Sequence, residues 1–159
     1  MPSRGHSLES AVNRCNLDYR KSKVALVEKK PTPIEITKLG AVMKQSTVDY
    51  TGILSPHGRG IAFDAKETKS KTSFPLANIK QHQLVFLEYW EAMGGLAFFL
   101  IHFTSLDDMA FMVPFDFVND YYVKAYLECT GRKSIPHKDF NQEWLVPLDN
   151  YLWKLIETA

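Results

Sequence analysis

Residues 60–67 read Gly60-Ile-Ala-Phe-Asp-Ala-Lys-Glu67, an apolar run that is interrupted by Asp64 and Lys66 and ends at Glu67. Successive side chains of a strand point to opposite faces, so Asp64 and Lys66 would share one face while Phe63 and Ala65 share the other. The run therefore predicts a strand that holds a carboxylate beside an ammonium on one side of a sheet.

A second acid lies shortly before this strand. Asp49 opens the apolar segment 49–54, and the turn-rich stretch Ser55-Pro-His-Gly-Arg-Gly60 separates that segment from the strand. This order is typical of a β-hairpin, which would fold Asp49 against Asp64 and Lys66. Two carboxylates and a lysine would then converge at one place.

These three side chains fit metal-dependent cleavage of a phosphodiester bond. Protein carboxylates and substrate phosphate commonly hold Mg²⁺, and the bound ion stabilises phosphoryl charge and supplies a nucleophile. Asp49 and Asp64 would bind the ion, and Lys66 would orient or help to deprotonate the attacking water. The spacing is also common by chance. The alternative is a surface hairpin with an ordinary solvated ion pair, worth ~0–1 kcal/mol.

Charge is divided unevenly along the chain. Residues 1–82 contain 14 Lys and Arg against 7 Asp and Glu, and residues 83–159 contain 5 against 11, although the net charge is only +1. Clustered basic residues attract polyanions, which favours nucleic acid over a small neutral substrate. The alternative is that the acidic half folds over the basic half.

Composition excludes several classes of protein. A chain of 159 residues with 45% hydrophobic residues fits one compact domain. Cys15 and Cys129 form no CxxC pair, and the histidines lack metal-ligand spacing, which argues against a zinc site and a disulfide framework. The longest apolar run, residues 96–101, is far too short to span a membrane. We therefore expect a cytoplasmic protein without a signal peptide.

The order of expected elements predicts an α/β fold, a mixed β-sheet with helices on both faces. Strand 96–103 is apolar on both faces and should lie centrally, and the site should lie at an edge or end of the sheet. The expected elements are a helix over about 7–20, a strand over 24–27, an extended segment over 34–45, the acid-bearing hairpin, a helix over about 78–93 ended by Gly94-Gly95, strands over 96–103 and 109–115, a helix over about 116–129 and a last helix over 150–157.

Several segments together resemble one family, the RecU-type Holliday junction resolvases of the PD-(D/E)xK nuclease superfamily. The resemblance runs in the same order over nearly the whole chain, and the joined pattern from Asp49 to Gln83 is far more specific than an acid and a lysine alone. The matching segments are Leu8–Asn16, Tyr19, Ala25–Ile34, Thr47–Gly52, Ile61–Lys69, Lys71–Leu76, His82-Gln83 and Gly131–Ile135.

The resemblance implies a restriction-endonuclease-like fold with a stalk-like extension over about residues 34–46. It also implies a homodimer that makes paired incisions in four-way junction DNA during recombination and repair, with Mg²⁺ as cofactor and Mn²⁺ as a substitute. By position, Asp49 and Asp64 resemble the metal-binding acids and Lys66 the catalytic lysine. Glu9 resembles a glutamate of the N-terminal helix near such sites, and Gln83 a glutamine beside the metal.

A recombinase or a branch-migration helicase would be the protein partner implied by the same resemblance. The setting would be the nucleoid, or the host cytoplasm for a phage-encoded copy. We expect contacts with the DNA backbone from basic and polar side chains, since these recognise phosphate without reading bases. The candidates are Lys38, Lys44, Gln45, Lys69, Lys71 and Thr72.

Two departures from the family pattern keep alternatives open. The segment between Pro33 and Asp49 is shorter than the stalk of the family, and only residues 1–6 precede the first helix, where family members usually carry a basic arm. One alternative is a nuclease that acts on linear or flapped DNA. Another is a non-catalytic protein that binds junctions or modulates a recombinase.

Overall fold

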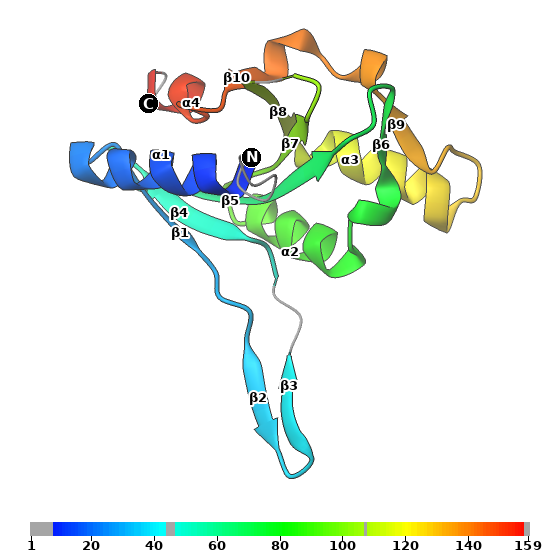
Figure 1. The fold of residues 1–159 in the computed structure, drawn as a ribbon, viewed down its shortest axis with the longest axis horizontal. Coiled ribbons are helices and arrows are strands. Elements are labelled where there is room, and N and C mark those ends of the chain that lie inside the picture. The colour runs from blue at the N-terminus through cyan, green and yellow to red at the C-terminus, as the bar shows by residue number, and fades with distance from the viewer. Residues whose placement is uncertain (1–7, 44–46, 107, 158–159) are drawn as a thin grey trace, which may run out of the picture.

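The computed structural model describes residues 8–43, 47–106 and 108–157. Its centre is a six-stranded sheet in the order β1-β4-β5-β7-β8-β10 (Figure 1). The strands are β1 (Ala25–Lys29), β4 (Tyr50–Leu54), β5 (Arg59–Thr68), β7 (Leu96–Phe103), β8 (Met109–Pro114) and β10 (Leu145–Pro147). β5 runs parallel to β7, and every other neighbouring pair is antiparallel. The predicted mixed sheet is therefore confirmed.

Helices cover both faces of this sheet, as predicted. One face packs against α1 and the residues just before α4, and the other packs against α2 and α3. The helices are α1 (Leu8–Ser22), α2 (Gln81–Ala92), α3 (Phe115–Tyr122) and α4 (Trp153–Glu157). Within the described ranges, no helix combines the length and the apolar composition needed to cross a bilayer.

The side-chain alternation of β5 contributes to both cores. Ile61 and Phe63 belong to the cluster beneath α1, whereas Ala62 packs with α2 and α3. The Phe63 ring lies between Tyr50 and Phe98, with centroid separations of 4.9 Å and 4.7 Å. Burying such a side chain stabilises the fold by roughly 1.5–3 kcal/mol. The strand that bears the acid and the lysine is thus fixed from both sides.

β7 confirms the prediction of a central strand, because it lies between β5 and β8 and every residue after Leu96 is buried. α2 ends at Ala92 and is followed by Gly94 with φ +94°, a left-handed conformation that favours glycine. The predicted end of the helix at Gly94-Gly95 is therefore confirmed.

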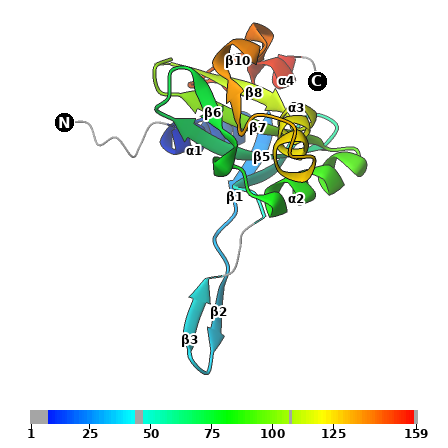
Figure 2. The same ribbon diagram turned by 90° about the vertical axis from the view of Figure 1, so that its right-hand side faces the viewer.

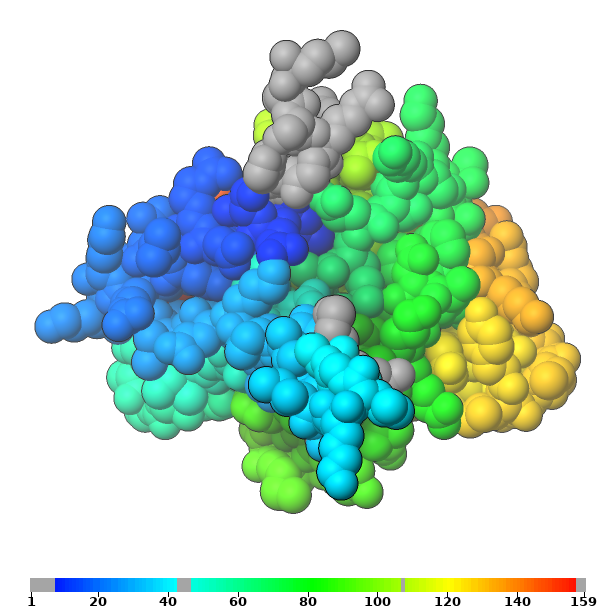
Figure 3. All heavy atoms as spheres, turned by 60° about the horizontal axis from the view of Figure 1, so that its bottom comes forward, coloured from blue at the N-terminus to red at the C-terminus, as the bar shows by residue number. Residues whose placement is uncertain are grey.

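Residues 34–43, expected as part of an extended segment, form a protruding hairpin. β2 (Ile34–Thr37) pairs with β3 (Gly40–Met43), and the hairpin stands away from the rest of the chain (Figures 1 and 2). All of β2 is exposed, and Leu39 at the tip is 100% exposed. Figure 3 views the molecule from this side, with the cyan hairpin in front of the body. We call residues 34–43 the protruding hairpin.

Other boundaries differ from the sequence-based expectation. α2 begins at Gln81, because Leu76–Asn78 form a separate 3-10 turn. The helix expected over about 116–129 is α-helical only to Tyr122 and continues as a π-helix over Val123–Leu127. The last helix begins at Trp153 rather than at residue 150.

The sequence analysis missed several short elements, because an element of three residues is too short to show a periodicity. β10 closes one edge of the main sheet, and β6 pairs with β9 in a sheet of two strands. The missed elements are β6 (Ser73–Pro75), β9 (Ser134–Pro136), β10 and the 3-10 turns Leu76–Asn78, His137–Asp139 and Gln142–Trp144.

Candidate active site

Asp49 and Asp64 lie side by side, as the predicted hairpin requires. β4 pairs with β5 so that Tyr50 lies opposite Phe63, which brings Asp49 next to Asp64. The backbone N–H of Asp49 donates to Oδ1 of Asp64 at 2.9 Å. The backbone N–H of Ala65 donates to Oδ2 of Asp49 at 3.1 Å. β4 and β5 are interior strands, so the pair lies at one end of strand β4 and not on an edge of the sheet.

Lys66 completes the cluster, because it lies two residues beyond Asp64 on the same face of β5. Its Nζ is 2.8 Å from Oδ2 of Asp64. The side chain of Asp64 is 2% exposed and that of Lys66 is 15% exposed. The solvated surface pair considered as an alternative is therefore wrong, since both charges are largely withdrawn from water.

Burial dominates the electrostatics of Asp64. Desolvation raises the pKa of its carboxyl group to about 6, and the charge on Asp49 adds to this effect. The ammonium of Lys66 and the N–H of Asp49 act in the opposite direction without cancelling it. A cation bound beside such a carboxylate favours its charged form, so the cation offsets the energetic cost of burying the charge.

The donor set fits a hard divalent cation. Asp49 and Asp64 supply oxygen ligands, the type that Mg²⁺ prefers, and two carboxylates are a usual protein contribution to its shell. Oδ1 of Asp49 makes no hydrogen bond with any described residue, which leaves this oxygen available. No group of three or more His, Cys, Asp or Glu side chains is placed to hold a metal within the described ranges. Waters and substrate oxygens would have to complete the shell.

Glu9 lies near Asp49, on the side of α1. A small cavity of about 160 Å³ separates the start of α1 from the strands, and its lining residues are Leu8, Glu9, Asp49, Tyr50, Ala65 and Glu67. Glu9 also forms an ion pair with Lys29 at the end of β1. The structure therefore places Glu9 beside the same cavity as Asp49, with a lysine as its direct partner.

Gln83 has a defined structural task at the start of α2. Its side-chain oxygen accepts a hydrogen bond from the backbone N–H of Lys80 at 3.1 Å, an arrangement that caps the helix. The residue is 9% exposed, so its side chain is largely buried at the start of the helix.

Glu67 and His102 are two polar residues near the cavity that sequence reasoning did not select. Oε1 of Glu67 accepts a hydrogen bond from the N–H of Leu8, the first residue of α1, at 2.9 Å. The same oxygen lies 3.7 Å from Nδ1 of His102, which is 3% exposed. Glu67 thereby joins α1 to the strand that carries Asp64. No sequence signal indicated the pairing of Glu67 with His102, since it depends on the register of β5 against β7.

Thr47 and Lys30 were likewise not selected. Nζ of Lys30 donates to Oγ1 of Thr47 at 3.0 Å, and the backbone N–H of Lys30 donates to the carbonyl of Asp49 at 2.7 Å. The available signal was the pair of lysines before Pro31 at the end of a predicted strand. Sequence alone could not assign different partners to Lys29 and Lys30.

The predicted DNA contacts fall on two parts of the surface. Lys38 is exposed in the turn of the protruding hairpin. Lys69, Lys71 and Thr72 lie in the segment that follows β5, and all three are exposed. Lys44 and Gln45 lie outside the described residues.

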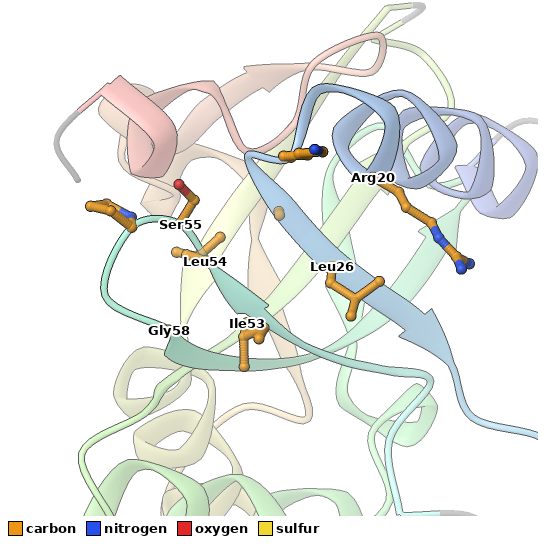
Figure 4. A pocket seen from close by; sticks show the side chains of 9 residues that line it. Arg20, Leu26, Ile53, Leu54, Ser55 and Gly58 are labelled. Atoms are coloured by element: carbon orange, nitrogen blue, oxygen red, sulfur yellow. The ribbon is translucent and has the colours of Figure 1, made fainter.

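A separate apolar hollow lies on the outer side of β1 and β4 (Figure 4). It has a volume of about 340 Å³, and cross-strand partners Leu26 and Ile53 both line it. Arg20 and Lys23 are among the residues that line it, and none of its described lining residues is an acid. This hollow therefore lacks the carboxylates that the predicted chemistry needs, and the candidate site remains the cluster at Asp49, Asp64 and Lys66.

Comparison with known proteins agrees with the sequence resemblance. The family described as Recombination protein U, RecU, matches residues 3–153. The Holliday junction resolvase RecU of Geobacillus thermodenitrificans is 37% identical over 152 residues, which cover 88% of this chain and 73% of that protein. The Holliday junction resolvase RecU of Leuconostoc citreum is 39% identical over 152 residues, with coverages of 88% and 71%. That of Lactococcus lactis subsp. cremoris is 38% identical over 145 residues, with coverages of 84% and 65%. The chain belongs to the RecU family.

Proposed function

We propose that this protein is a Holliday junction resolvase, an endonuclease that cuts four-way DNA junctions by hydrolysing phosphodiester bonds with a divalent cation. The observation that carries the proposal is the cluster of Asp49, Asp64 and Lys66, in which two hydrogen-bonded carboxylate residues lie beside a largely buried ammonium. Membership of the RecU family supports the choice of substrate.

Asp49 and Asp64 would hold the cation, Mg²⁺ or Mn²⁺. The bound ion would neutralise phosphoryl charge and lower the pKa of a bound water. The hydrogen bonds from the N–H groups of Asp49 and Ala65 restrict the two carboxylates to one arrangement before the cation binds. The protein therefore loses little conformational entropy in assembling the site when it meets its substrate.

Lys66 would act on the phosphate or on the attacking water. Its Nζ is held 2.8 Å from Asp64, so the ammonium stays within reach of whatever Asp64 binds. A cation in a site with little water stabilises developing negative charge far better than the same cation in bulk solvent. We propose lesser roles for Glu9, which lies at the cavity beside Asp49, and for Gln83, which orders the start of α2.

Junction selectivity would come from the protruding hairpin. Its exposed strands stand away from the body beside the end of β1 and the start of β4, close to Asp49. Such a projection can enter the open centre of a branched DNA, which a continuous duplex does not offer. Lys38 and the group at Lys69, Lys71 and Thr72 would contact the backbone on either side.

Two copies of the chain would act together, because paired incision needs two active sites. We therefore propose a homodimer that acts in the cytoplasm, with a recombinase or a branch-migration helicase as the protein partner.

The decisive experiment compares a labelled immobile four-way junction with a duplex of matched sequence, each in Mg²⁺ and in EDTA. Wild-type protein should nick two strands of the junction symmetrically in Mg²⁺ only, and Asp64→Asn should nick neither DNA. Equal cleavage of both DNAs would reject junction selectivity while keeping the nuclease. Tight junction binding without cleavage in any cation would reject the nuclease and favour a non-catalytic junction-binding protein.

A further inference from the structure

Lys30 occupies an unusual position between the protruding hairpin and the candidate site. It follows the last residue of β1, and its backbone N–H donates to the carbonyl of Asp49 at 2.7 Å. This hydrogen bond continues the pairing of β1 with β4 by one step beyond Lys29 and Tyr50. The main chain of Lys30 is therefore fixed directly against the first of the two acids.

The ammonium of Lys30 has polar and aromatic neighbours but no acidic one within the described ranges. Nζ donates to Oγ1 of Thr47 at 3.0 Å and lies 4.7 Å from the centre of the Phe86 ring. No described carboxylate lies within 4.0 Å of it, whereas the neighbouring Lys29 pairs with Glu9. The two consecutive lysines thus have different surroundings, and Lys30 is the one whose charge no described acid balances.

This environment favours an anion. A half-buried ammonium has lost part of its hydration, and a hydroxyl group and a ring replace that hydration only in part. Thr47 and Asp49 are both partly exposed, whereas Val48 between them is buried in the core. The ammonium of Lys30 donates to Thr47, and the backbone N–H of the same lysine donates to the carbonyl of Asp49, so the charge lies beside the segment that leads into Asp49.

We propose that Lys30 binds a backbone phosphate of the DNA strand to be cut, adjacent to the phosphate at Asp49 and Asp64. This inference rests on the proposed nuclease function and adds a DNA contact to it. The contact lies at the base of the protruding hairpin, so Lys30 would fix the path of the strand between the hairpin and the acids. The ring of Phe86 and the hydroxyl group of Thr47 would hold the ammonium in place before DNA arrives.

A purely structural role is the competing explanation. Lys30 also ties the segment at Thr47 to α2 through Phe86, and that tie alone could order Asp49. The two explanations differ in one measurable quantity. A lysine that binds phosphate releases counterions, so its removal lowers the slope of log K against log salt by about 0.9 for each phosphate that is no longer neutralised. A structural tie does not change that slope.

The test measures junction binding in EDTA, where cleavage does not interfere, over a series of salt concentrations. The variants are Lys30→Met, which keeps a long unbranched side chain but removes the charge, and Lys30→Arg, which keeps the charge. Lys21→Met is the matched control, because Lys21 is an exposed lysine in the last turn of α1, beyond the other end of β1 and about 16 Å away along the strand. Melting temperatures establish that each variant is folded.

We expect Lys30→Met to lower the slope by about 0.9 per bound protomer, and Lys30→Arg and Lys21→Met to retain the slope of the wild type. An unchanged slope for a folded Lys30→Met, in a protein whose wild type still cuts junctions, would overturn the phosphate contact and leave the nuclease intact. The same decrease in Lys21→Met would also overturn it, since the effect would then be one of net charge. Wild-type protein that neither binds nor cuts the junction would reject the proposed function and this contact together.

Discussion

Asp49 and Asp64 fix each other through the backbone of the neighbouring strand. The N–H of Asp49 donates to the Asp64 carboxylate at 2.9 Å, and the residue after Asp64 returns a hydrogen bond of 3.1 Å to the Asp49 carboxylate. This reciprocal arrangement makes the position of each acid depend on the register of β4 against β5. The same register builds the core around Phe63, so folding and assembly of the site are one event.

Asp64 should make the stability of the protein depend on pH. Its pKa is raised from 3.8 to about 6 in the folded state, so the folded state holds this proton more tightly than the unfolded chain. Ionisation therefore destabilises the fold progressively as pH rises from about 4 to about 6, after which the penalty, at most about 3 kcal/mol, stays constant.

Asp64→Asn removes this penalty and also gives up the ion pair with Lys66. We expect the variant to melt above the wild type at neutral pH without divalent cations, with the difference shrinking toward about pH 4. Thermal unfolding followed by circular dichroism over this pH range measures the effect. A wild type that is more stable than Asp64→Asn at neutral pH would mean that the ion pair outweighs the burial penalty.

Divalent cations should stabilise the wild type through Asp49 and Asp64. A ligand that binds only the folded state adds about 2.7 kcal/mol at a concentration of about 100 times its Kd. Adding Mg²⁺ should therefore raise the melting temperature of the wild type, and EDTA should reverse the increase.

Asp49→Asn should lose this response, whereas Asp18→Asn, which alters an exposed acid on α1, should keep it. The same cation response in Asp49→Asn would contradict the proposed metal site.

Lys66→Met should separate cleavage from binding. Loss of the ammonium removes charge stabilisation at the reacting phosphate, so we expect single-turnover cleavage to fall by about 100-fold or more. Junction affinity in EDTA should change by less than about tenfold, since Lys66 would neutralise one phosphate at most.

Lys69→Met provides the comparison, because Lys69 lies three residues farther along, beyond the end of β5. It should weaken binding but keep the cleavage rate at saturating protein. If Lys66→Met reduced affinity and cleavage in equal proportion, Lys66 would be a binding or structural residue instead.

Glu67 should stabilise the start of α1. Its carboxylate accepts the N–H of Leu8, one of the helix donors that has no partner within the helix. Glu67→Ala should lower the free energy of unfolding by about 1 kcal/mol, in the range of a missing helix cap. Glu67→Gln should retain most of the wild-type stability, because the amide oxygen can still accept the hydrogen bond.

Urea denaturation measures both variants. His102→Asn in the same series tests whether the neighbouring ring contributes, since Nδ1 of His102 lies 3.7 Å from the Glu67 carboxylate. Equal stability of Glu67→Ala and the wild type would contradict the proposed contribution to α1.

The protruding hairpin should serve selectivity without serving stability. Replacing residues 34–43 with a short Gly-Ser linker removes no residue of the hydrophobic core, so the melting temperature should change by no more than a few degrees. The shortened protein should lose its preference for the junction over the duplex while retaining Mg²⁺-dependent nicking of any DNA that it still cuts. Competition binding with both DNAs measures the preference. A shortened protein with undiminished junction preference would assign selectivity to the body of the fold.

The class of the fold and the identity of the cluster could be predicted from the amino-acid sequence. Alternating residues of 60–67 specified a strand with two different faces, and the turn-rich stretch before it specified a hairpin. These are local properties, since the two-residue period and turn chemistry act over a few residues. The placement of Asp49 beside Asp64 followed from them, and the structure contains that hairpin.

The surroundings of the cluster depend on tertiary packing. The burial that raises the pKa of Asp64 arises only when the sheet and the layers that cover it bring together segments distant in the chain. Likewise, Glu67 meets Leu8 across 59 residues, and Lys30 meets Thr47 and Phe86 only after β1, β4 and α2 have come together. No periodicity encodes such contacts, because they depend on strand order and register. The sequence therefore identifies the acids and the lysine, whereas tertiary packing determines their charge, their partners and their access to DNA.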